Sequence, residues 1–218
     1  MSELLEIYDL NGKLSGVEER DLFYTRIEAE FHETGKITSK VKTIRVVLLN
    51  SQGRIYLQKR SSLKNYNPSL YDKTVGGHVP TGYSFENATT KECAEELGFP
   101  ATIVEVSDFM EVVKNVDLHV IGIFKKIDFI ENYQSVRIDK DRNIIIQPVI
   151  TAVYLGYYDG AIRFVDGEAS GVEVFSLSEL QAEINKNPDK FTDDIKFIVQ
   201  SYSNKLKPLS ELSIDKGD

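Results

Sequence analysis

The segment Gly76–Phe99, GGHVPTGYSFENATTKECAEELGF, holds the pattern on which the fold prediction depends. It opens with a glycine pair, passes through a Pro/Gly turn, and continues with helical periodicity after Ser84. Ser84 suits an N-cap, because its hydroxyl can accept a hydrogen bond from a free backbone N–H of the first turn. Gly98 suits the left-handed position that follows many helices. The segment therefore predicts a glycine-rich loop followed by a helix that ends at Leu97.

This predicted helix has an apolar face and an acidic face. Residues spaced by four form the apolar stripe, namely Phe85, Thr89, Cys93 and Leu97. Glutamates at positions i, i+3 and i+4 are expected to share the second face, namely Glu92, Glu95 and Glu96. Their repulsion, about 0.2–0.5 kcal/mol per pair, would be relieved by a hard divalent cation, which prefers oxygen ligands. The simpler alternative is a solvated helix face in which Lys91 pairs with Glu95.

The segment resembles the Nudix box, G-x5-E-x7-R-E-U-x-E-E-x-G-U, where U is a bulky apolar residue. The spacing from Gly77, on the first glycine, to Phe99, on the last U, contains no gap. The three box glutamates that usually bind metal are matched by Glu92, Glu95 and Glu96. Tyr83 and Lys91 stand where the box has Glu and Arg, a departure that favours a binding module with weakened catalysis as one alternative.

The resemblance implies an α+β fold, a Nudix-type α/β/α sandwich with a mixed β-sheet. It implies that Glu92, Glu95 and Glu96 bind Mg²⁺, with Mn²⁺ as the alternative ion. The same three glutamates are the candidate catalytic residues, since one of them would accept a proton from the attacking water. The expected partner is a small molecule with a diphosphate linkage, nucleoside-diphosphate-type or related, which the protein would hydrolyse.

Three residues outside the acidic face are candidates for holding the cofactor or the substrate phosphates. Gly77 allows a sharp loop in which backbone approaches the helix closely. His78 follows it, with a structural loop histidine as the simpler interpretation. Arg60 precedes the segment and could meet phosphates, although exposed cations are common. Glu168 is a candidate fourth metal carboxylate, with an ordinary loop glutamate as its alternative.

The N-terminal half resembles the Nudix branch that contains isopentenyl-diphosphate isomerase and related hydrolases. The similar stretches are YDLNGKLSG, NSQGRIYLQKRS and NPSLYDKTVGGHV. Isomerases of this branch carry a catalytic cysteine two residues before the histidine that His78 matches, where this chain has Gly76. They also have a histidine-rich metal site; His32 is a candidate match for one ligand, but Val41–Arg45 contains no histidine for a second. These two departures argue against isomerase chemistry, and an isomerase is kept as the other alternative to the hydrolase.

Local patterns predict the remaining elements. Asn11-Gly12 is a type I′ turn signal between the first two strands, and Leu22, Ile27 and Phe31 are expected on the apolar side of the helix that follows. Strands are expected at 5–8, 13–17, 44–49, 54–60, 101–113, 118–127 and 144–157, and helices at 18–33, from 177 to 185–188, and at 192–205. Residues 129–143 are polar and are predicted to form a long loop or hairpin tip. We divide the chain into an N-terminal hairpin and helix extension packed on the domain (1–35), a Nudix domain (36–206) and a polar tail (207–218).

Composition limits the classes of function. The 218 residues are 41% hydrophobic and 28% charged, which suits a globular protein with a sizeable core. A net charge of −8 argues against a general nucleic-acid or anionic-membrane binder. One cysteine excludes an internal disulfide and suits a reducing compartment. Because neither a signal peptide nor a membrane-spanning run is evident, we expect a cytoplasmic protein, with a homodimer left open.

Overall fold

The protein is described here by a computed structural model that covers residues 3–163 and 169–212. Its main sheet runs in the order β11-β5-β4-β10-β9-β8, with β6 paired to β5 and β7 paired to β4. The strands are β4 (Lys42–Leu49), β5 (Ile55–Arg60), β6 (Tyr71–Asp72), β7 (Val75–His78), β8 (Ala101–Ile103), β9 (Gly122–Ile138), β10 (Ile144–Tyr157) and β11 (Ala169–Phe175). The sheet is mixed, because β10 pairs with β4 and β8 with β9 in parallel while the other pairs are antiparallel.

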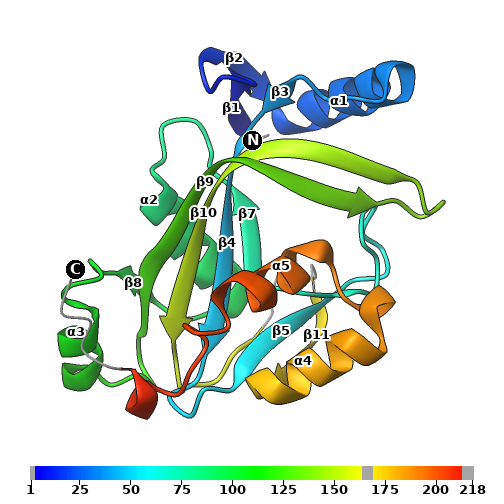
Figure 1. The fold of residues 1–218 in the computed structure, drawn as a ribbon. Helices are drawn as coiled ribbons and strands as arrows, with labels where there is room; N and C mark the ends of the chain where they lie inside the picture. Colours follow the sequence, from blue (N-terminus) through cyan, green and yellow to red (C-terminus); the bar gives the residue numbers. More distant parts are fainter. Residues whose placement is uncertain (1–2, 164–168, 213–218) are drawn as a thin grey trace.

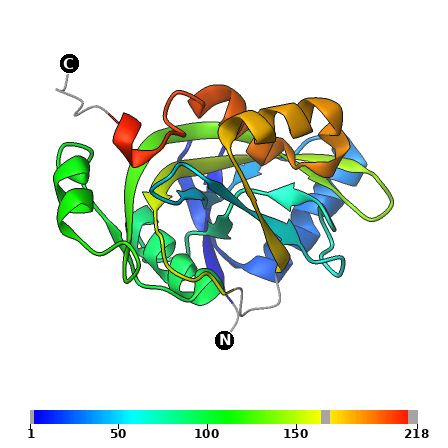
Figure 2. The same ribbon diagram turned by 90° about the horizontal axis from the view of Figure 1, so that it is seen from below.

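Helices cover both faces of this sheet (Figures 1 and 2). One face carries α2 (Phe85–Glu92) and the π-helical turn η1 (Cys93–Leu97). The opposite face carries α4 (Leu177–Lys186) and α5 (Asp193–Tyr202), and α3 (Phe109–Asn115) lies near the β8 edge. Short 3₁₀ turns occupy Pro188–Lys190 and Leu209–Glu211. The predicted α/β/α sandwich with a mixed sheet is confirmed.

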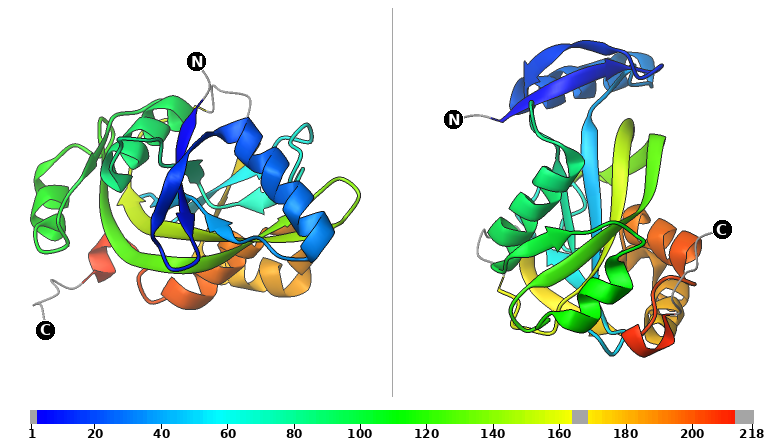
Figure 3. Two further views of the ribbon diagram at one scale, coloured as in Figure 1. Left: turned by 90° about the horizontal axis from the view of Figure 1, so that it is seen from above. Right: turned by 90° about the vertical axis from the view of Figure 1, so that its left-hand side faces the viewer.

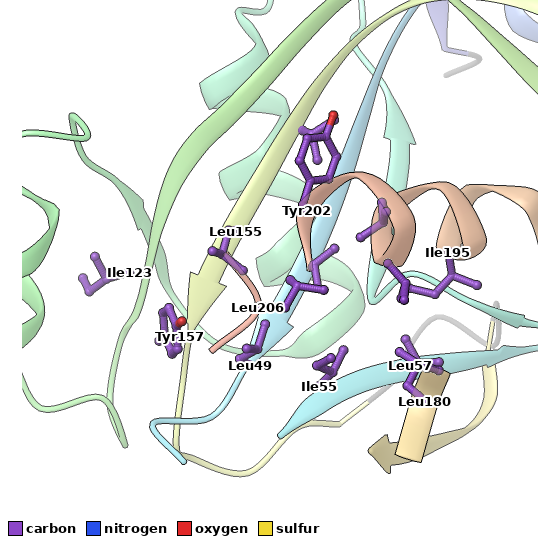
Figure 4. Packing of buried hydrophobic residues seen from close by; sticks show 14 of the residues in the cluster. Leu49, Ile55, Leu57, Ile123, Leu155, Tyr157, Leu180, Ile195, Tyr202 and Leu206 are labelled. Carbon is purple, nitrogen blue, oxygen red and sulfur yellow. The ribbon is translucent and has the colours of Figure 1, made fainter. Parts of the chain in front are cut away.

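Strand β4 is mostly apolar because it is buried on both faces of the sheet. Val47 and Leu49 belong to the core cluster beneath α4 and α5, part of which Figure 4 shows. Ile44, Val46 and Leu48 belong to the cluster beneath α2. Successive side chains of a strand point to opposite faces, so a strand covered on both sides needs apolar residues at every position.

The N-terminal residues form a separate small unit over one end of the main sheet (Figure 3). A three-stranded sheet has the order β2-β1-β3, with β1 (Leu4–Asp9), β2 (Leu14–Glu19) and β3 (Ser39–Lys40), and it packs with α1 (Arg20–Thr34). A third core cluster joins this unit to the main sheet, since Phe23 and Ile27 of α1 are grouped there with Val149 of β10. The 1–35 extension remains our proposed division of the chain.

The N-terminal predictions hold with two corrections. The hairpin and the helix are present, and the left-handed Gly35 ends α1 with its N–H bound to the Phe31 carbonyl at 2.8 Å. Leu22, predicted to be on the apolar side of this helix, is instead 60% exposed, and Phe23 is buried in its place. The Asn11-Gly12 turn is not type I′, because that turn needs positive φ at both residues and here Gly12 alone of the two has it.

The region after the box segment differs most from the prediction. The strand predicted at 101–113 is wrong beyond Ile103, because Phe109–Asn115 forms α3. Phe109 and Val113 lie four residues apart and are both buried, so packing of a helical stripe outweighs the strand preference of the valines. The polar residues predicted as a loop at 129–143 mostly continue strand β9 to Ile138, leaving a tip at 139–143.

Both C-terminal helices begin with a side-chain cap. Ser176 accepts a hydrogen bond from the Glu179 N–H and the Glu179 side chain bonds back, which makes a capping box at the start of α4. The Thr192 hydroxyl caps α5. Within the part of the chain that the structure describes, no helix is long and apolar enough to span a membrane.

Candidate active site

The helix that follows the glycine pair forms as predicted, except in its last turn. The loop predicted at the pair is wrong, because Gly76 and Gly77 belong to strand β7, and the turn follows at Pro80–Tyr83. The Ser84 hydroxyl accepts a hydrogen bond from the Asn87 N–H at 3.1 Å, and Gly98 adopts the left-handed conformation with φ 74°. The α-helix ends at Glu92, and Cys93–Leu97 forms a π-helical turn. The expectation of a regular α-helix to Leu97 is therefore wrong, because a π turn closes i→i+5 hydrogen bonds and shifts the residues after it.

The three box glutamates have very different surroundings. The Glu95 side chain is 58% exposed and that of Glu92 is 14% exposed, while Glu96 is buried at 4%. Burial and the nearby Glu95 carboxylate raise the pKa of Glu92, which Lys91 partly offsets. The carboxylates thus do not form one evenly exposed face.

Gly77 lies directly against Glu92. A Cβ atom placed on Gly77 would lie 2.9 Å from Cδ of Glu92 and 3.1 Å from its Oε1. Such distances are far inside van der Waals contact, so any side chain at position 77 would displace this carboxylate. The glycine that opens the box therefore lets the Glu92 side chain lie against strand β7.

Lys91, which stands at the arginine position of the box, bridges two of the glutamates. Its Nζ lies 2.6 Å from Oε2 of Glu95 and 3.5 Å from Oε1 of Glu92. The i,i+4 pair expected for an ordinary helix face is therefore present. Tyr83, at the glutamate position of the box, is 46% exposed.

The three box glutamates have the right donor atoms for a metal ion, but they are not arranged around a common point. Carboxylate oxygens are the donors that Mg²⁺ prefers. Within residues 3–163 and 169–212, however, no three His, Cys, Asp or Glu side chains are already grouped as a metal site. The ammonium of Lys91 instead lies between Glu92 and Glu95. The candidate Glu168 lies outside the described residues.

A cavity of about 370 Å³ opens beside the glycine pair. Its walls include Gly76, Gly77 and His78 of β7, and residues of α1, β4, the 61–70 loop and β9. Its lining contains four carboxylates and six cationic side chains, the latter being Arg20, Arg45, Arg60, Lys64, Lys73 and Arg137. This formal balance of +2 contrasts with the −8 of the whole chain, so the cavity would attract an anionic ligand.

An ionic network forms one wall of the cavity. Arg45, only 3% exposed, donates to Asp194 at 3.2 Å and lies 4.0 Å over the Tyr133 ring. Lys73 donates to the other Asp194 oxygen at 2.8 Å. Although burial opposes ionisation of the carboxyl, Arg45 and Lys73 hold the pKa of Asp194 well below its usual range. Asp194 is therefore a buried anion held by two cations.

Asp72 extends this network to Arg60. Its carboxylate lies 3.2 Å from Lys73 Nζ and 3.4 Å from Arg60, and it accepts from the Thr192 hydroxyl at 2.7 Å. Arg60 also donates to the Tyr66 carbonyl at 3.0 Å. The predicted Arg60 thus lines the cavity, with part of its hydrogen-bonding capacity engaged by the protein.

The side chain of Lys73 lies across Gly76. A Cβ on Gly76 would be 2.5 Å from Cε of Lys73 and 2.9 Å from its Nζ. The space that a cysteine would need at position 76 is therefore filled by this lysine.

His78 faces the N-terminal helix from the cavity wall. Its Nε2 lies 2.6 Å from the hydroxyl of Tyr24 in α1. Burial, together with the charges of Arg137 and Arg20, lowers the pKa of His78 well below its usual value. Its imidazole is therefore neutral at pH 7.

Several of these residues were not predicted from the sequence, namely Tyr24, Arg45, Asp72, Lys73, Arg137 and Asp194. A signal existed for Arg45, because an arginine inside an apolar strand must find a partner. No comparable signal marks Asp194, whose partners are distant in the chain.

Comparison with known proteins agrees with this fold. A family model described as NUDIX domain matches residues 39–195, and the chain belongs to that family. It is 25% identical over 192 residues to a Serratia proteamaculans isopentenyl-diphosphate Delta-isomerase, covering 88% of this chain and 87% of that one. It is 28% identical over 181 residues to an uncharacterized Nudix hydrolase of Clostridium acetobutylicum, covering 78% and 77%.

Solved structures show the same fold. A crystal structure of a Deinococcus radiodurans protein superposes with a TM-score of 0.61 at 20% identity, covering 91% of this chain and 98% of that one. A bifunctional NMN adenylyltransferase/ADP ribose pyrophosphatase from Francisella tularensis, solved with AMP and a manganese ion, gives a TM-score of 0.52 at 15% identity. It covers 85% of this chain and 47% of that one. The resemblance to the Nudix family and its isomerase-like branch is thereby confirmed.

Proposed function

We propose that this protein is a Mg²⁺-dependent hydrolase that cleaves a diphosphate linkage in a nucleoside-diphosphate-type or related small molecule. The observation that carries the proposal is the cation-lined cavity beside Gly77, whose opposite side contacts Glu92. The cavity is lined by Gly76, Gly77 and His78 but by none of the three box glutamates, so a ligand there would reach the box carboxylates across Gly77, against which Glu92 lies. The membership of the Nudix family supports the same reaction class.

Glu92, Glu95 and Glu96 are the residues that would hold the ion, Mg²⁺ or Mn²⁺. When bound, such an ion neutralises a diphosphate and lowers the pKa of a coordinated water. Lys91 would then move away from Glu92 and Glu95, which its 35% exposed side chain permits. One of the three glutamates would accept the proton of the attacking water.

Substrate contacts would come from the cavity wall. Gly77 and His78 place strand β7 at the cavity, and Arg60 contributes charge from β5. The ionic network behind them holds the wall in position, because Arg45 and Lys73 are fixed by Asp194. A small molecule is therefore the expected partner; the cytoplasmic location and a homodimer stay predictions of the sequence.

Isomerisation is the second candidate, because relatives bear the isomerase name. Gly76 supplies no acid at the position that resembles the isomerase cysteine. The overlap of a position-76 side chain with Lys73 supports the same conclusion, since a cysteine there would force the lysine away from Asp194. Hydrolysis therefore stays the preferred function.

The test is a panel of diphosphate compounds assayed with Mg²⁺, containing nucleoside diphosphates, ADP-ribose and isopentenyl diphosphate. We expect release of a phosphorylated product from at least one compound, and a loss of at least about tenfold in Glu96→Gln, equivalent to about 1.4 kcal/mol. The matched control is Glu111→Gln, which changes an exposed glutamate of α3. Equal turnover and Mg²⁺ affinity in Glu96→Gln and the wild type would refute the site assignment.

A further inference from the structure

We propose that Tyr24 of the N-terminal helix is a positioning residue of the active site, which fixes the orientation of His78 and presents Arg137 to the anionic substrate. The part of this proposal in which Arg137 binds an anionic substrate rests on the proposed function. The contact itself does not, because it is a property of the folded chain. The N-terminal unit would then complete the cavity rather than only cover the end of the sheet.

The direction of the hydrogen bonds follows from the chemistry of the donors. Arg137 Nη2 lies 2.7 Å from the Tyr24 hydroxyl oxygen, and a guanidinium can only donate. The Tyr24 oxygen therefore accepts from Arg137, which leaves its single hydrogen available for His78 Nε2, 2.6 Å away, and we assign it there. A neutral imidazole has one N–H, so that hydrogen is on Nδ1. This side of the ring faces the Glu3 carboxylate at 3.8 Å.

Arg137 is held between two aromatic rings. Its guanidinium carbon lies 4.4 Å from the Tyr24 ring centre and 5.5 Å from that of Tyr66. The Tyr66 hydroxyl donates in turn to Glu28, so both rings are anchored to α1. This arrangement fixes a flexible side chain on the β9 side of the cavity.

Arg137 differs from three neighbouring cations of the cavity in having no carboxylate partner among the described residues. Arg45, Arg60 and Lys73 each pair with Asp72 or Asp194. Arg137 lines the same cavity, but it forms no salt bridge with any described residue. Its guanidinium has five N–H donors, of which one is used by Tyr24. It is therefore suited to bind an anionic group of the ligand.

The first experiment reads the orientation of His78 without any substrate. Histidine-labelled ¹⁵N protein has three imidazoles, and His78→Gln identifies the signal of interest. We expect an Nδ1–H tautomer in the wild type and a changed tautomer population in Tyr24→Phe. The control is Tyr8→Phe, because Tyr8 also belongs to the N-terminal unit and bonds a carboxylate, that of Glu6, outside the cavity. A wild-type spectrum in Tyr24→Phe would overturn the proposal.

The second experiment measures binding of inorganic pyrophosphate by calorimetry in the absence of metal. Tyr24→Phe keeps the ring beneath Arg137 and removes both hydrogen bonds, so we expect its Kd to rise about threefold to tenfold, the range for one hydrogen bond. Arg137→Gln should weaken binding at least as much. The double variant should bind more weakly than Arg137→Gln by less than the loss in Tyr24→Phe alone, since Tyr24 acts in part through Arg137.

Each outcome of these measurements decides the proposal. Equal losses in Tyr24→Phe and Tyr8→Phe would show general destabilisation and overturn it, as would additive losses in the double variant. If Tyr24→Phe does not fold, Arg137→Gln removes the same Arg137–Tyr24 hydrogen bond from the other side and is read in the same two assays. Loss of pyrophosphate affinity without any diphosphate hydrolysis by the wild type would uphold this contact and reject the proposed function.

Discussion

Asp194→Asn should destabilise the fold strongly at neutral pH. The Asp194 carboxylate pairs with Arg45 at 3.2 Å and Lys73 at 2.8 Å, and it accepts from the Tyr133 hydroxyl at 3.0 Å. Lys73 keeps Asp72 after the substitution, but the 3% exposed Arg45 loses its carboxylate. Removing one partner of a buried pair costs about 3–5 kcal/mol. For a chain of this length, that lowers Tm by about 6–20 °C.

The pH dependence gives this prediction a second part. Because the folded-state pKa of Asp194 is lowered, its stabilisation is present above the unfolded-state pKa, about 3.9, and is lost as pH falls toward the folded-state value. The difference in unfolding free energy between wild type and Asp194→Asn should therefore be constant from pH 7 to 5. Below about pH 4 it should shrink by about 1 kcal/mol per pH unit.

Urea denaturation from pH 7 to 3.5 measures both parts, since urea does not screen charges as guanidinium does. The matched control is Asp193→Asn, one residue away, whose side chain is 41% exposed and pairs with Lys196 at 2.6 Å. That exposed pair should contribute less than about 1 kcal/mol. A cost below about 1 kcal/mol for Asp194→Asn, or a cost equal to that of Asp193→Asn, would refute the reasoning.

Three further predictions follow from other sites. Gly77→Ala should reduce turnover at least about tenfold, because the new Cβ would displace Glu92. The control Gly16→Ala should leave turnover unchanged, since no atom lies within 4 Å of a Cβ there. Equal turnover in Gly77→Ala and the wild type would contradict the contact with Glu92. Cys93 is fully buried, and burial raises the pKa of its thiol, so Cys93 should react with a thiol reagent only after unfolding. Rapid labelling of the native protein would contradict this prediction. Ser176→Ala should cost about 1 kcal/mol in urea, since it removes the capping box of α4, and an unchanged midpoint would rule this out.

The parts of the fold that were predicted are those that depend on local chemistry. The Ser84 cap and the left-handed Gly98 are set by nearby residues, and the resemblance to the box extended them to the whole sandwich. The apolar run Val46–Leu49 of β4 likewise indicated a buried strand. The α3 helix was missed because its valines favour a strand, and burial of Phe109 and Val113 on one helical stripe outweighs that preference.

The candidate site was predictable only in part. The box glutamates, Gly77 and the Lys91–Glu95 pair were found by spacing, but the π turn after Glu92 and the approach of Lys91 to Glu92 were not. The cavity itself depends on contacts between distant segments, such as Tyr24 with Arg137. No local pattern specifies such pairs, because they are set by the way the N-terminal unit packs on the sheet.

The central claim is tested most directly by ³¹P and ¹H NMR of the enzyme with Mg²⁺ and a mixture of ADP-ribose, a nucleoside diphosphate and isopentenyl diphosphate. The account predicts that the diphosphate resonances of at least one compound are replaced by monophosphate resonances. It also predicts that EDTA stops the change, that Glu96→Gln slows it at least about tenfold, and that the double bond of isopentenyl diphosphate does not move. Migration of that double bond at a catalytic rate, with every diphosphate left intact, would contradict the account.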